Sequence, residues 1–156
     1  MSKFHPDVRD EDGVEAGANW GAMAAIILGF LALLSAVPNF YTVIRLAGIE
    51  EAGPLVILSA VALGVMVLEA IVCFVAAWRF MQRKGLVIGV LLAVLTLLDL
   101  LARLVQAAFG AMPVWQLAMM ILYLPILYGL FQGVRAARGA KRLGTLARTD
   151  LGSVFS

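Results

Sequence analysis

Three ionisable residues lie inside apolar stretches of this sequence and are its strongest candidates for chemistry: Glu69, Asp99 and Arg103. A charged side chain inside a bilayer costs about 3 kcal/mol on insertion scales, so such residues usually face protein, pair with one another or mark a proton or ion pathway. Asp99 and Arg103 are four residues apart, so they share a helix face and can form an ion pair. Glu69 has no cation at that spacing on its own helix, and a mid-membrane carboxyl is what a proton-coupled carrier needs.

Other polar residues fall at similar depths along the apolar segments. A helical rise of about 1.5 Å per residue places them in two layers, about 20 Å and about 15 Å from the outer ends of their segments. The two layers are Glu69 with Thr96 and Tyr128, and Asp99 with Arg103 and Tyr123. We expect these side chains to point inward and to lie within hydrogen-bonding distance, directly or through one water. Such layers would act either as polar clamps that fix helix register or as a proton or ion relay.

Residues suited to enzymatic, haem or metal chemistry are scarce. The single histidine, His5, lies in the N-terminal segment, and the single cysteine, Cys73, lies in an apolar run without a histidine to activate it. Helical haem and metal sites normally use inward-facing histidines or a Glu-x-x-His pair. No nucleophile-elbow, zinc-protease or phosphate-loop motif is present. We therefore expect no catalytic residue, cofactor or metal, and interpret Cys73 as a small apolar filler.

The elements that position these residues are long apolar helices. The chain has 156 residues, of which 63% are hydrophobic and 14% charged, whereas soluble domains are about half apolar and a quarter charged. Four unbroken apolar runs exceed the roughly 20 residues that a helix needs to cross a bilayer, and they lack the alternation of a transmembrane β-barrel. The expected fold is all-α, an integral membrane four-helix bundle with short loops. Its spans are expected at about residues 20–44, 54–78, 86–109 and 113–134.

Basic residues mark one side of this bundle. They follow the second span as Arg79, Arg83 and Lys84, and the fourth span as Arg135, Arg138, Lys141, Arg142 and Arg148. The positive-inside rule places both segments in the cytoplasm, and four spans then place the N-terminus there too. We expect an acidic cytoplasmic tail over 1–18, a transmembrane domain over 19–134 and a basic cytoplasmic tail over 135–156. The expected location is the cell (cytoplasmic or inner) membrane.

Several segments allow two interpretations. Pro38 either ends the first span, leaving a separate interfacial helix over 40–52, or lies in a kinked extension of that span. Pro125 is expected to kink the fourth span. The basic segment 134–148 either extends the fourth helix against anionic lipid or only anchors topology. The acidic stretch from Asp7 to Glu15 either meets this basic tail or a partner, or is a solvated tail.

Small residues four apart indicate close helix packing. Three such pairs, at a shared cytoplasmic depth, are Gly17 with Gly21, Gly85 with Gly89, and Gly129 with Gly133. Glycines at this spacing allow two helix backbones to approach closely. A fourth pair, Ala60 with Gly64, lies in the outer half of the second span.

These observations favour a non-catalytic membrane subunit that packs against other membrane subunits or against itself. The alternative is a small proton- or ion-coupled carrier or channel that uses Glu69 and Asp99. A membrane enzyme or binder of lipophilic ligands is a third hypothesis. The lipid bilayer is the expected environment in every case, and no feature indicates a nucleic-acid partner.

Overall fold

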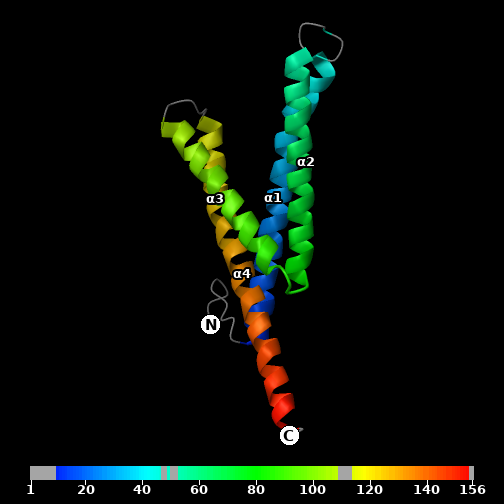
Figure 1. Cartoon of the computed structure of the whole chain (residues 1–156). Coiled ribbons are helices and arrows are strands. Elements are labelled where there is room, and N and C mark those ends of the chain that lie inside the picture. The colour runs from blue at the N-terminus through cyan, green and yellow to red at the C-terminus, as the bar shows by residue number, and fades with distance from the viewer. Residues whose placement is uncertain (1–9, 47–48, 50–52, 109–113, 155–156) are drawn as a thin grey trace. The chain divides into compact units, whose positions relative to one another are not determined.

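A computed structural model describes residues 10–46, 49, 53–108 and 114–154, and these residues are almost entirely helical (Figure 1). The four helices are α1 (Glu11–Leu46), α2 (Gly53–Met81), α3 (Leu86–Ala108) and α4 (Val114–Val154). Each is long and apolar enough to cross a membrane, and the described part of the chain contains no strand. The predicted all-helical architecture with four candidate spans is therefore confirmed.

The first helix begins nine residues before its predicted start, inside the segment expected to be an acidic tail. Asp10 is its N-cap, because its Oδ1 accepts a hydrogen bond from the Gly13 N–H at 2.8 Å. A carboxylate at this position satisfies an amide that has no partner within the helix. Val14, one turn later, is buried, so packing also holds this first turn. Residues 11–18 are thus helical and continuous with the first span, and their expected place in a cytoplasmic tail stays a prediction.

Two prolines lie inside helices without ending them. Helix α1 continues through Pro38 to Leu46, so the observed structure is an extension of the first helix and not a separate interfacial helix over 40–46. The rest of the proposed 40–52 segment lies, except for Ile49, outside the described residues. Helix α4 likewise continues through Pro125. Internal prolines are tolerated in apolar spans because neighbouring groups can satisfy the backbone carbonyls that proline leaves without a donor.

The fourth helix also continues well beyond its predicted apolar span. It reaches Val154, so the basic segment 134–148 is helical. This is the conformation expected if the segment extends the fourth helix.

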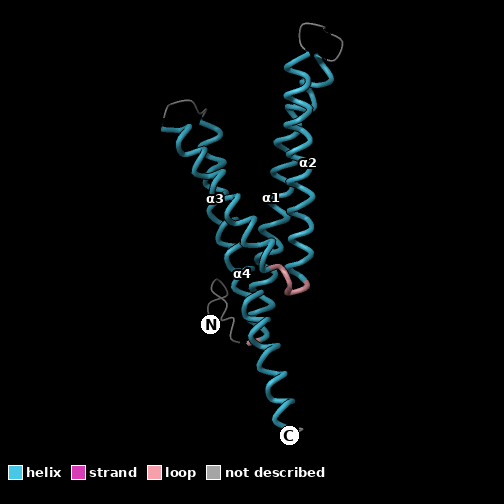
Figure 2. Tube along the Cα trace, viewed as in Figure 1, coloured by secondary structure: helices cyan, strands magenta, loops and turns pink. Residues whose placement is uncertain are grey.

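A short loop joins α2 to α3 (Figure 2). Arg83 has a φ of 60°, a left-handed conformation that side chains other than glycine rarely adopt. Its N–H donates to the Phe80 carbonyl at 2.8 Å, and the Lys84 N–H donates to the Arg79 carbonyl at 2.9 Å. These two bonds form a Schellman cap, which satisfies the last carbonyls of α2 and turns the chain toward α3.

The chain divides into two compact units. The first comprises Met1–Ala25 and Ala76–Ser156, and in it α3 and α4 lie side by side (Figure 1). The second comprises Ile26–Val75, the greater part of α1 and α2.

In the second unit, α1 and α2 contact each other through small and aromatic residues. The Phe30 and Phe74 rings meet edge to face with centroids 5.5 Å apart. Gly29 leaves room for Cys73 and Phe74, since a Cβ on Gly29 would lie 3.2 Å from both side chains. Cys73 is fully buried here, where its small sulfur-bearing side chain fits against the glycine. The Asn39 amide also lies 3.5 Å from the Met66 Sδ.

Candidate functional site

Two of the predicted glycine pairs face each other across α1 and α4. A Cβ added to Gly21 would lie 2.6 Å from the Gly133 Cα, closer than real Cβ atoms approach backbone. One added to Gly17 would lie 2.9 Å from the Ala136 Cβ, and one added to Gly129 would lie 2.7 Å from the Ala24 Cβ. The two helix backbones are therefore in direct contact, the arrangement that small residues four apart permit.

The third glycine pair packs against a single aromatic ring. Phe80, near the end of α2, is only 1% exposed. A Cβ on Gly85 would lie 2.6 Å from its Cδ1, one on Gly133 would lie 2.8 Å from its Cε1, and one on Gly89 would also overlap the ring. We call the six glycines together with Phe80 the glycine junction. All its members belong to the same compact unit, and together they join the first part of α1, the end of α2, the middle of α4 and the start of α3.

The sequence interpretation missed two buried members of this region, Phe80 and Gln132. Gln132 lies between two junction glycines of α4 and is fully buried. Its Oε1 accepts a hydrogen bond from Arg135 Nη1 at 3.3 Å. Two sequence features could have identified them. Gln132 is a polar amide on the small-residue face of Gly129 and Gly133, and Phe80 is an aromatic residue close to the loop glycine Gly85.

In the second predicted polar layer, Arg103 contacts both Asp99 and Tyr123, and the inward orientation expected for all three side chains stays a prediction. Arg103 Nε donates to Asp99 Oδ2 at 2.9 Å, and the Arg103 guanidinium lies 5.3 Å from the centroid of the Tyr123 ring. Tyr123 is buried on α4, while the side chains of Arg103 and Asp99 are 30% and 45% exposed. The carboxylate and the ring face together compensate one guanidinium charge between α3 and α4.

The three residues of the first predicted layer do not all belong to one compact unit. Thr96 is buried, but its hydroxyl donates to the Leu92 carbonyl of its own helix at 2.8 Å, a bond common for threonine in helices. Glu69 is exposed on α2 and belongs to the other unit from Thr96 and Tyr128. A layer that joins these three residues stays a prediction.

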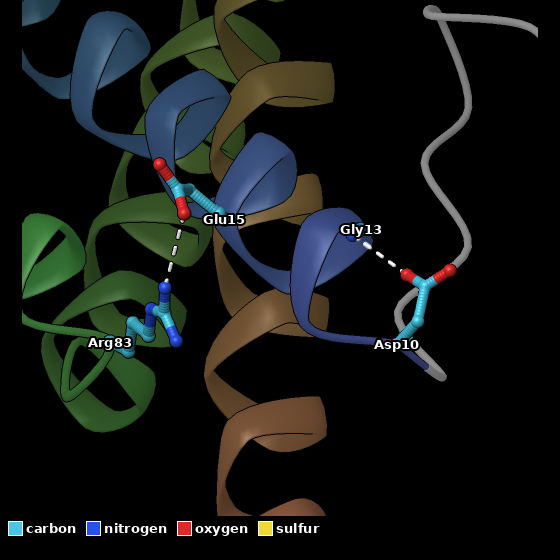
Figure 3. A network of polar contacts seen from close by, with 4 residues as sticks. All are labelled: Asp10, Gly13, Glu15 and Arg83. Carbon is cyan, nitrogen blue, oxygen red and sulfur yellow. Dashed lines mark hydrogen bonds and ion pairs between the residues drawn. The ribbon is translucent and has the colours of Figure 1, made fainter.

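An ion pair links the start of α1 to the α2–α3 loop (Figure 3). Arg83 Nη2 lies 3.2 Å from Glu15 Oε2, and both side chains are exposed. Thus one member of the acidic stretch contacts the basic α2–α3 loop. Asp7, at the other end of that stretch, lies outside the described residues. Exposed pairs of this kind contribute at most about 1 kcal/mol.

Within the described ranges, no group of three or more His, Cys, Asp or Glu side chains is placed to hold a metal ion. Comparison with protein-family models, with curated proteins and with solved structures finds no match to this chain. The glycine junction allows close packing, and the Asp99–Arg103–Tyr123 cluster allows charge compensation inside an apolar helix pair.

Proposed function

We propose that this chain is a non-catalytic subunit of the cell membrane that packs against other membrane subunits or against copies of itself. In this proposal both termini are cytoplasmic, because the positive-inside rule places the basic α2–α3 loop and the basic end of α4 on that side. The observation that carries the proposal is the open small-residue face of α2.

This face contains Ala60 and Gly64. A Cβ added to Gly64 would meet nothing within 4 Å, whereas neighbouring helices fill the space beside the junction glycines of α1 and α4. The large side chains beside it, Ile57 and Leu68, are also exposed. Lipid covers large apolar side chains well, but small residues in apolar helices are enriched where another helix approaches. The α2 face therefore supports a role in helix association.

Site-directed cross-linking in native membranes tests this role. The background is Cys73→Ala, which removes the only cysteine of the chain. Gly64→Cys is expected to give a cross-linked product of defined mass, either a dimer of this chain or a complex with one partner. Val65→Cys is the matched control, because the next residue points about 100° away around the helix. A Gly64→Cys chain that yields no more product than Val65→Cys would contradict the proposal.

A flux assay separates this proposal from the carrier alternative. Purified protein in proteoliposomes is expected to show no proton-coupled flux above that of empty liposomes. Flux that is present and is lost in Glu69→Gln would refute a role limited to packing, because this substitution removes the carboxyl group that could carry a proton and keeps the side-chain volume.

A further inference from the structure

A groove with a volume of about 600 Å³ runs between α3 and α4. Its walls and both helices belong to the same compact unit as the glycine junction. The groove is apolar over most of its length and basic at one end, which is the pattern of a site for an amphipathic anion.

The α3 wall is wholly apolar. It consists of Val90, Ala93, Val94 and Leu97, whose spacing of three and four residues places them on one helix face. Ala93 contributes the smallest side chain of this wall. No acidic side chain lines the groove in the described part of the chain.

The α4 wall changes from apolar to cationic along its length. Leu127 and Phe131 are followed, on the same helix face, by Arg135 and Arg138. From Leu127 to Arg138 the helical rise amounts to about 16 Å, close to the roughly 15 Å depth of one leaflet's hydrocarbon. The arginines come directly after the predicted end of the fourth span, the level at which lipid headgroups lie.

The structure also positions one of the two guanidinium groups. Arg135 donates to the Oε1 of Gln132, which is itself fully buried in α4. A guanidinium has five N–H donors in a fixed planar fork, so a bond to Gln132 is compatible with further bonds to a phosphate. Paired N–H donors of this kind match the geometry of phosphate oxygens.

We propose that this groove binds one anionic phospholipid, with an acyl chain along the apolar walls and the phosphate at Arg135 and Arg138. Charge complementarity selects a lipid with net negative charge over a zwitterionic lipid, since basic pockets between spans attract anionic headgroups. The site uses neither the α2 face nor Glu69, so it stands independently of the proposed function.

Native mass spectrometry of the full-length protein in detergent tests the site. The protein is titrated with dioleoyl phosphatidylglycerol and, separately, with dioleoyl phosphatidylcholine. One phosphatidylglycerol is expected to bind about fivefold or more tightly than phosphatidylcholine, since each basic residue near an anionic headgroup contributes about that factor. Equal binding of the two lipids would overturn the proposal.

Variants locate the site. Arg138→Ala is expected to weaken phosphatidylglycerol binding about fivefold, and the double variant with Arg135→Ala to remove the preference for the anionic lipid. Arg79→Ala, a basic residue at the end of α2 that does not line the groove, is the matched control and should leave binding unchanged. A loss in Arg79→Ala as large as that in Arg138→Ala would show diffuse attraction to basic residues and would contradict a defined site.

The acyl-chain part of the groove has its own test. Ala93→Phe fills the groove while both arginines remain, so bound phosphatidylglycerol should fall to the level of the double arginine variant. Helical content by circular dichroism and the thermal transition identify any variant that fails to fold. In that case Ala93→Leu, a smaller change at the same position, replaces it. Tight phosphatidylglycerol binding by a folded Ala93 variant would overturn the proposed site.

Discussion

At the scale of single residues, close contact in this protein depends on the absence of side chains. Gly21 and Gly133 bring the backbones of α1 and α4 together, and the Phe80 ring fills the adjoining space next to Gly85. Any Cβ at these positions would have to displace either a helix backbone or a buried ring. Protein interiors are close-packed, so displacements of this kind are costly.

We predict that Gly21→Ala destabilises the protein by about 1–3 kcal/mol, the usual cost of overpacking a well-packed contact. The added Cβ would lie 2.6 Å from the Gly133 Cα, and backbone at that place cannot yield as a flexible side chain would. The measurement is the free energy of unfolding in detergent, or the shift in the thermal transition.

Gly64→Ala is the matched control for this substitution, because nothing lies within 4 Å of a Cβ at Gly64. It makes the same chemical change in a helix and is expected to be neutral or slightly stabilising, since alanine favours helices over glycine by up to about 1 kcal/mol. Equal destabilisation by both substitutions would argue against steric packing as the role of Gly21.

At the scale of secondary-structure elements, the end of α2 combines a favourable cap with an unfavourable residue. The cap places Arg83 in the left-handed region, where glycine is the usual residue. The same conformation brings the Arg83 side chain to Glu15 (Figure 3). The ion pair is exposed, so it offsets only part of the backbone strain.

We expect Arg83→Gly to stabilise the protein by about 0.5–1 kcal/mol, because it removes a conformational cost of about 1–2 kcal/mol and loses a weak ion pair. Arg83→Val should destabilise it by about 1 kcal/mol, because a β-branched residue fits this region poorly. Glu15→Gln removes the ion pair alone and should change stability by less than about 0.5 kcal/mol. Thermal unfolding of the three variants checks these values. Arg83→Gly and Glu15→Gln both lose the same ion pair, so a stability for Arg83→Gly no higher than that of Glu15→Gln would contradict a backbone strain at Arg83.

The α3–α4 pair contains its own compensating arrangement. Arg103 on α3 contacts Asp99 on the same helix and the Tyr123 ring on α4. Removal of one charge leaves the other without its ion-pair partner in an apolar setting, which costs more than removal of both.

For this cluster we predict that Arg103→Leu destabilises the protein by about 1–2 kcal/mol, the cost of leaving a partly exposed charged group without its partner. The double variant Arg103→Leu with Asp99→Leu should recover most of that loss. Unfolding free energies of the two single variants and the double variant form the double-mutant cycle that measures the coupling. Additive effects would mean that Asp99 and Arg103 contribute independently, despite their 2.9 Å contact.

At the scale of the whole molecule, the chain combines four helices that are apolar enough to cross a membrane with an asymmetric distribution of basic residues. The α2–α3 loop carries Arg83 and Lys84, and the polar end of α4 carries half of the remaining lysines and arginines. The first connecting segment, around Ile49, has little basic charge. The positive-inside rule turns this asymmetry into a prediction of topology.

Reporter fusions test the predicted topology. Alkaline phosphatase, which is active only outside the cytoplasm, should be active when fused after Ile49 and inactive when fused after Lys84 or at the C-terminus. A fluorescent protein that folds in the cytoplasm should show the complementary pattern. The reverse activities would overturn the predicted orientation while leaving the four-helix fold intact.

Sequence reasoning predicted the helices better than their ends. The apolar runs located all four helices, because only a helix satisfies its own backbone in such a long apolar segment. The sequence pattern did not predict the start of α1 at Glu11, since that start depends on the Asp10 cap and on packing around Val14. It left Pro38 with two outcomes, because the local pattern does not show whether neighbouring groups can tolerate an internal proline.

The sequence by itself determined the all-helical class, the position of the four apolar segments and the shared helix face that allows Asp99 to pair with Arg103, since all three follow from hydropathy and helical periodicity. Only the tertiary structure decided which small residues meet. It placed Gly21 against Gly133 and the Phe80 ring among glycines, and left Gly64 open. The physical reason is that periodicity defines the faces of one helix, whereas the partner of a face depends on how several helices fill space together.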